Sequence, residues 1–146
     1  MKNNSSPAHI LLVDDNHDGV LIRRALLEEQ GYSVECASDG EGGFDLFQRN
    51  TYDLVVTDFR MPRMNGIDMI RRIRALRPDT RIVLLSGAVE PLGLTEANTG
   101  ADAVIAKSAS EPSHLIRAVK RLLAGRLRRK PVTSQRGLSR SRAVGE

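Results

Sequence analysis

The feature that most limits the fold of this chain is a series of short apolar-rich runs, each of which ends at a polar residue. These runs occupy residues 8–13, 53–57, 81–85 and 103–106. A further segment, residues 32–37, alternates apolar and polar side chains. Continuous apolar runs of this length are typical of strands buried on both faces of a parallel sheet. The pattern therefore predicts five strands.

Segments with helical periodicity separate the predicted strands. The expected helices lie around residues 20–29, after Asp39, and at about residues 67–76 and 111–124. Strands that alternate with helices form βαβ units, which give a parallel sheet with helices on both faces. The sequence therefore predicts a doubly wound α/β domain over residues 8–124.

The helix expected between the fourth and fifth strands has a poor helical sequence. Pro91 and Gly93 both lie in this segment, and each is costly inside a helix. We therefore expect the fourth helix to be short, late or irregular.

Composition excludes several classes of protein. Aromatic residues make up only 3% of the chain and Trp is absent, which argues against a surface that stacks nucleic-acid bases on rings. Cys36 is the single cysteine, so an internal disulfide or a cysteine zinc site is not supported. A cytoplasmic location is the natural expectation. No apolar run is long enough for a signal peptide or a membrane span, and no membrane association is predicted.

Positive charge is concentrated at the C-terminal end. Residues 125–146 contain 7 Lys or Arg and 1 acidic residue, whereas residues 1–124 contain 15 and 17. The end segment has few apolar residues, and we predict a basic, disordered tail over 125–146 and a disordered segment over 1–7. The tail is too short for a helix-turn-helix output domain. Salt-sensitive contact with nucleic-acid phosphates is the functional alternative to a solvated tail.

The polar residues that end the runs carry the chemistry. Asp14 and Asp15 follow the first strand, and Asp58 follows the third. Because the carboxyl ends of parallel strands meet at one edge of the sheet, these carboxylates should lie in one crevice. Their mutual repulsion is relieved by a divalent cation, and an all-oxygen donor set suits Mg²⁺.

Two further residues reach the same edge, Ser86 after the fourth strand and Lys107 after the fifth. A hydroxyl and an ammonium group are both suited to bind phosphoryl oxygens. Asp58 is then the candidate nucleophile, since a carboxylate can form an aspartyl-phosphate. The structural alternative to a phosphoryl site is that these residues only cap helices at the loop edge, because Asp and Ser favour such positions.

Four motifs, which follow one another along the chain, support the hypothesis of a phosphoryl-binding site. They are Leu11–Asn16 (LLVDDN), Asp53–Gly66 (DLVVTDFRMPRMNG), Leu84–Ala88 (LLSGA) and Gly100–Lys107 (GADAVIAK). Together they resemble the receiver domain of bacterial two-component response regulators, over about residues 8–124. This resemblance implies a flavodoxin-like (βα)5 fold with strand order 2-1-3-4-5.

The resemblance also implies a role for each site residue. Asp58 would be the phosphoacceptor. Asp15, Asp58 and the backbone carbonyl of Arg60 would hold Mg²⁺, and Asp14 would reach the ion through water. Ser86 and Lys107 would bind the phosphoryl group, by positioning and charge neutralisation. The donor would be a phosphohistidine on a sensor histidine kinase or a phosphotransfer protein.

Three departures from the family pattern fall on the face that family members use for output. Ser108 stands where the family usually has Pro after the lysine, with a cis peptide bond before it. Val104 stands where a Tyr or Phe usually reports activation. The interrupted fourth helix is the third departure. These departures therefore bear on signal transmission more than on phosphorylation.

The favoured function is a stand-alone receiver in a phosphorelay, a phosphoprotein that switches its affinity for an unidentified downstream protein and is not a turnover enzyme. One alternative is a phosphorylation-independent docking module or a basic-tailed, nucleic-acid-associated protein on the same fold. A Mg²⁺-dependent phosphatase with an Asp nucleophile is less favoured. In that case a second acid would be expected two residues after Asp58, where the sequence has Arg60.

Overall fold

A five-stranded parallel sheet forms the centre of the molecule. The computed structural model describes residues 6–128. The strands are β1 (His9–Val13), β2 (Ser33–Ala37), β3 (Leu54–Asp58), β4 (Arg81–Ser86) and β5 (Ala103–Ala106). They lie in the order β2-β1-β3-β4-β5, which confirms the predicted fold class and strand order.

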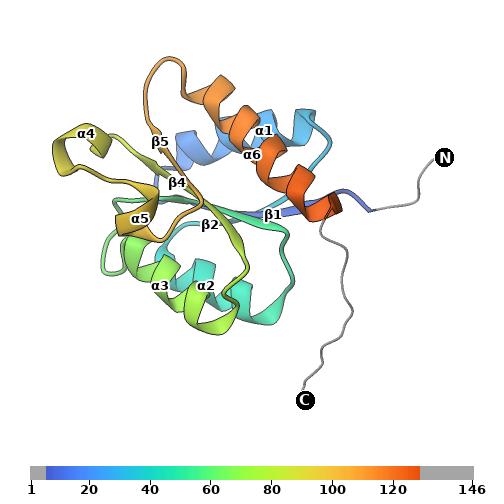
Figure 1. Cartoon of the computed structure of the whole chain (residues 1–146), viewed down its shortest axis with the longest axis horizontal. Helices are drawn as coiled ribbons and strands as arrows, with labels where there is room; N and C mark the ends of the chain where they lie inside the picture. The colour runs from blue at the N-terminus through green and yellow to red at the C-terminus, as the bar shows by residue number, and fades with distance from the viewer. Residues whose placement is uncertain (1–5, 129–146) are drawn as a thin grey trace.

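Helices cover both faces of this sheet. They are α1 (His17–Glu29), α2 (Gly40–Arg49), α3 (Gly66–Leu76), α4 (Val89–Leu92), α5 (Glu96–Thr99) and α6 (Glu111–Arg128). Figure 1 shows α1 and α6 on one side of the sheet and α2 and α3 on the other. The arrangement is the doubly wound α/β sandwich that alternating strands and helices predict.

Two apolar clusters hold the layers together, one on each face of the sheet. Ile10 and Leu12 of β1 pack in the cluster beneath α1 and α6, whereas Leu11 and Val13 pack in the cluster beneath α2 and α3. All four side chains are fully buried. Successive residues of a strand point to opposite faces, so a strand covered on both sides must be apolar throughout. This burial explains the unbroken apolar run of β1.

Strand register brings the polar ends together. Val13 of β1 pairs with Thr57 of β3, and Asp58 of β3 pairs with Leu85 of β4. Ser86, the next residue of β4, pairs with Ala106 of β5. The residues at and just after these positions therefore lie along one edge of the sheet, where open α/β folds place their functional crevice.

The segment between β4 and β5 is irregular, as Pro91 and Gly93 predict. It forms two four-residue helices, α4 and α5, instead of one long helix. Gly93 ends α4 with a φ of 63°, in the left-handed region that glycine adopts without a steric penalty. Pro91 is tolerated because it lies in the first turn of α4. Backbone N–H groups in a first turn have no acceptor within the helix, so the missing N–H of proline breaks no hydrogen bond.

The last helix is longer than the sequence pattern predicts. α6 begins at Glu111, as expected, but continues to Arg128, four residues beyond the expected end at Ala124. The predicted disorder of residues 1–7 and 125–146 falls mostly on residues 1–5 and 129–146, which lie outside the described part of the chain. Within that part, no helix is long and apolar enough to cross a membrane.

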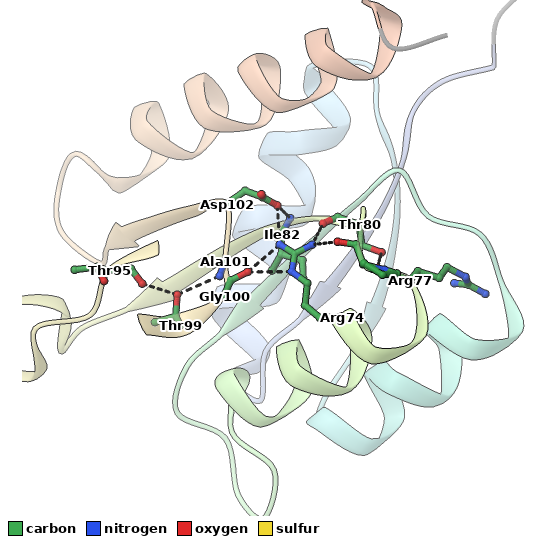
Figure 2. Close-up of polar contacts among 10 residues, drawn as sticks. Arg74, Arg77, Thr80, Ile82, Thr95, Thr99, Gly100, Ala101 and Asp102 are labelled. Atoms are coloured by element: carbon green, nitrogen blue, oxygen red, sulfur yellow. Dashed lines mark hydrogen bonds and ion pairs between the residues drawn. The ribbon is translucent and has the colours of Figure 1, made fainter. Parts of the chain in front are cut away.

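A cluster of polar contacts around Arg74 closes the opposite edge of the sheet (Figure 2). From α3, its guanidinium donates to the carbonyl oxygens of Gly100 at 2.8 Å and Pro78 at 2.8 Å, and to that of Thr80. It also pairs with Asp102 at 3.0 Å, whose carboxylate accepts a 2.8 Å hydrogen bond from the N–H of Ile82. Arg74 thus joins the loops that lead into β4 and β5.

Candidate functional site

Three carboxylates meet where β1 and β3 end. One oxygen from each of Asp14, Asp15 and Asp58 lies within 4.8 Å of the others. Asp14 and Asp58 are 1% and 5% exposed, whereas Asp15 faces solvent. The sequence predicted this group from its position after two neighbouring strands. All the ligand atoms are carboxylate oxygens, which fits a hard divalent cation such as Mg²⁺.

Lys107 brings a positive charge to this cluster. Its Nζ atom lies 2.6 Å from Oδ1 of Asp58. Its backbone N–H donates to the carbonyl oxygen of Ser86 at 2.9 Å, which fixes the start of the loop after β5 beside the end of β4. The structure therefore brings Lys107 and Asp58 together as the sequence predicted.

The environment of Asp58 affects the pKa of its carboxyl group in two opposite directions. Burial raises the pKa of Asp58 above its ordinary value, and the negative charges of Asp14 and Asp15 raise it further. Lys107 opposes them, but the net direction is upward. An ionised Asp58 is thus held in a place that disfavours its charge.

Ser86 is buried at the end of β4. Its Oγ atom accepts a 2.9 Å hydrogen bond from the backbone N–H of Ala88, so the hydroxyl hydrogen remains free for another acceptor. In sequence Ser86 directly follows Leu85, the register partner of Asp58. The register thus places its backbone near the acidic cluster, as predicted.

The loop that follows Asp58 contains Arg60 and is shaped by its end at α3. Asn65 caps α3 by accepting a 2.9 Å hydrogen bond from the N–H of Asp68, and Asp68 accepts a hydrogen bond from Asn65 in return. This capping box satisfies two N–H groups at the helix start. The Arg60 guanidinium lies 5.7 Å from the centre of the Phe59 ring. Its side chain therefore rests on that ring.

An open hollow of about 380 Å³ lies between this loop and the acidic cluster. Its lining residues are Asp15, Phe59, Arg60, Met61, Pro62 and Asn65. The exposed carboxylate of the cluster thus faces a space that a small charged group could enter.

The structure shows how the chain is arranged at Ser108 and Val104, the two positions near Lys107 that depart from the family pattern. The described residues contain no cis peptide bond, so the bond before Ser108 is trans. The Oγ of Ser108 lies 3.2 Å from that of Ser110 and accepts from its N–H at 3.3 Å, which forms a local turn. Val104 is half-buried and packs against the core cluster beneath α2 and α3, where it leaves no aromatic ring to move.

An arginine that the sequence analysis missed also contacts the cluster. Arg23 of α1 donates from Nη1 to Oδ2 of Asp14 at 2.7 Å. It also donates to both carboxylate oxygens of Glu111, at 2.8 and 2.9 Å. The hydrogen bond with Glu111 is the main reason that the pKa of Arg23 is raised. Arg23 and Glu111 are 88 residues apart in sequence, so no local pattern pointed to this contact.

Comparison with known protein families shows which family the chain belongs to. The sequence pattern of the "Response regulator receiver domain" matches residues 10–120, most of the chain. The chain belongs to the response regulator receiver domain family. Its acidic cluster is typical of the receiver domain site.

Two proteins with curated descriptions resemble this receiver domain. The "Gliding motility regulatory protein" of Myxococcus xanthus is 36% identical over 116 residues, which cover 77% of this chain and 15% of that protein. The "Transcriptional regulatory protein RprY" of Bacteroides fragilis is 34% identical over 120 residues, which cover 80% of this chain and 51% of that protein. The chain thus spans about half, or less, of the length of these relatives.

A solved response regulator structure shows the same fold. The response regulator TrrA of Thermotoga maritima, solved in complex with Mg²⁺-BeF, is 30% identical to this receiver domain with a TM-score of 0.72. The match covers 79% of this chain and 98% of that one. The similarity therefore extends across almost the whole of that solved chain.

Proposed function

We propose that this receiver domain accepts a phosphoryl group on Asp58 from the phosphohistidine of a sensor histidine kinase or phosphotransfer protein. The contact between Lys107 and Asp58, 2.6 Å long and beside two further carboxylates, carries this proposal. It sets a buried acceptor, a cation and a metal-suited acidic pair in one place. Receiver domain membership supports the same chemistry.

The transfer needs little covalent chemistry from the protein. A carboxylate oxygen of Asp58 attacks phosphorus, and the new O–P bond forms as the N–P bond of the phosphohistidine breaks. The imidazole nitrogen keeps the electron pair of the broken bond. Catalysis then consists of alignment and charge neutralisation at the phosphoryl oxygens.

Each site residue has a distinct part in this proposal. Lys107 holds Asp58 in place and supplies positive charge to the phosphoryl oxygens. Ser86 has a free hydroxyl hydrogen to donate to one of them. Asp15, Asp58 and the backbone carbonyl of Arg60 would hold Mg²⁺ directly, and Asp14 would do so through water. When bound, the ion would neutralise charge on the phosphoryl group.

The expected output is a change in affinity for a separate protein rather than turnover of a substrate. Val104 lies in β5, the strand that follows the split α4 and α5 segment, so any output signal must use a route without a moving aromatic ring at this position. The alternative is a docking module whose binding is independent of phosphorylation. The two functions differ in one measurable property, which is uptake of phosphate.

Intact-mass spectrometry tests the proposal. The purified protein is incubated with acetyl phosphate and Mg²⁺, alongside Asp58→Asn and a metal-free sample. We expect one added phosphate in the wild-type protein and none in either control. If wild-type protein takes up no phosphate and does not bind beryllofluoride, the docking module becomes the better description.

A further inference from the structure

The contacts of Arg23 join two acids from distant parts of the chain. Its side chain is 12% exposed and lies between Asp14 and Glu111, whose side chains are 1% and 8% exposed. Two parallel hydrogen bonds to Glu111 form the rigid fork that guanidinium and carboxylate groups favour. The third, at 2.7 Å, reaches the acidic cluster. One positive charge is therefore shared between two carboxylates.

This shared charge fixes one end of the connection between β5 and α6. The connection begins at Lys107, which pairs with Asp58, and ends at Glu111, the first residue of α6. Glu111 is joined through Arg23 to Asp14. Both ends of residues 107–111 are thus bound, directly or through one arginine, to carboxylates of the same cluster.

We propose that Arg23 is a positioning residue that couples cation binding at the acidic cluster to the start of α6. The inference deepens the proposed function and rests on the Mg²⁺ site assigned there. The charge of Arg23 opposes the entry of a divalent cation beside Asp14. Glu111 reduces that opposition because it holds part of the charge.

Coupling of this kind acts in both directions. If Glu111 changes the affinity of the cluster for a cation, a bound cation must change the interaction between Arg23 and Glu111 by the same free energy. The start of α6 therefore responds to occupation of the site. This route does not need an aromatic residue at position 104.

Isothermal titration calorimetry with Mg²⁺ alone tests the coupling through the sign of two effects. Removing the positive charge with Arg23→Gln is expected to tighten Mg²⁺ binding by about fivefold, because a cation-cation repulsion is lost. Removing the negative charge with Glu111→Gln is expected to weaken binding by about threefold, since Arg23 then acts on the cluster alone. A purely structural pair would shift both affinities in the same direction or shift neither.

Neighbouring residues provide matched controls. Arg24 is the next residue of α1, and it pairs with Glu28 on the exposed surface rather than with the acidic cluster. Arg24→Gln and Glu28→Gln make the same changes of charge and should leave Mg²⁺ affinity within about twofold of wild type, because solvent screens exposed charges. Equal effects at Arg23 and Arg24 would contradict a specific role for Arg23.

A double variant guards against loss of folding. Arg23→Gln alone leaves Glu111 buried without its partner, whereas Arg23→Gln with Glu111→Gln keeps the charge balance. Circular dichroism verifies that each variant is folded. In ¹⁵N NMR spectra, Mg²⁺ should shift the backbone amides of Glu111 and Ser113 in wild type, and the double variant should lose that shift while still binding Mg²⁺.

The outcomes separate the two proposals. Opposite shifts at Arg23 and Glu111, together with loss of the α6 response, support the coupling. Shifts of the same sign, or an unchanged α6 response in the double variant, overturn the coupling and leave the phosphoacceptor site intact. Absence of Mg²⁺ binding by the wild-type protein would overturn the metal site itself.

Discussion

The Nζ atom of Lys107 lies 2.6 Å from Oδ1 of Asp58, and this ion pair joins the ends of β5 and β3 across the intervening β4. The carboxylate is largely buried and the lysine is partly exposed. Removing Lys107 is costly, because it leaves the buried charge of Asp58 without compensation. Lys107 therefore compensates part of the cost of a buried charge at the centre of the proposed chemistry.

Replacement of Lys107 by Met should raise the pKa of Asp58 further. Lys107 is the group that opposes burial and the neighbouring carboxylates, so its loss leaves only effects that favour the protonated acid. A ¹³C NMR titration of the Asp58 carboxyl group measures the change. Lys120→Met, on the exposed surface of α6, is the matched control. An unchanged pKa in Lys107→Met would show that the ion pair does not form in solution.

Replacement of Asp58 by Asn should make the protein more stable at neutral pH. The pKa of Asp58 is raised in the folded state, so the folded protein binds the proton more tightly than the unfolded chain does. Its contribution to stability is full below the unfolded pKa and is lost as pH rises through the folded pKa. Asn carries no charge, and we expect the melting temperature at pH 7.5 to rise by about 3 °C.

The pH dependence distinguishes this cause from a general packing effect. The difference between Asp58→Asn and wild type should shrink as pH falls through the raised pKa of Asp58, because the wild-type carboxyl then also becomes protonated. Differential scanning calorimetry at several pH values measures both curves. A gap of constant size across that range would assign the stabilisation to something other than the charge of Asp58.

Replacement of Gly66 by Ala should disturb the site through its backbone. A Cβ atom at position 66 would overlap the carbonyl oxygen of Asp58 and crowd the Cα of Phe59. Both neighbours are backbone atoms that cannot swing away, so we expect a loss of about 3 kcal/mol in the free energy of unfolding. Urea denaturation followed by circular dichroism measures it. Gly87→Ala is the control, since an added Cβ there meets nothing within 4 Å.

The acidic cluster could be predicted because it depends on two regular features. Apolar runs marked the strands, and the acids at their carboxyl ends had to meet once those strands were parallel. Asp14, Asp58 and Lys107 were found in this way, and the cluster geometry and the ion pair agree with it. The interrupted helix before β5 could also be predicted, because Pro91 and Gly93 disfavour a helix through their local backbone geometry.

Contacts between distant side chains could not be predicted in this way. In the sequence, Arg23 is one of several charged residues on the polar side of α1. Glu111 is an acid in the first turn of a helix, where its negative charge interacts favourably with the helix dipole. Only the packing of α1 beside α6 turns the two into a buried pair. The end of α6 was also misjudged, since the basic residues after Ala124 allow a helix as readily as a tail.

Replacement of Arg74 by Ala should destabilise the protein without altering phosphate uptake. Arg74 donates hydrogen bonds to three backbone carbonyls and pairs with Asp102, at the edge of the sheet opposite the acidic cluster (Figure 2). Several bonds to a charged donor are lost at once, and we expect a loss of about 2 kcal/mol in the free energy of unfolding. Arg71→Ala, which removes one exposed pair with Asp68, should cost about 0.5 kcal/mol or less. Urea denaturation measures both variants, and equal stability of the two would refute a clamping role for Arg74.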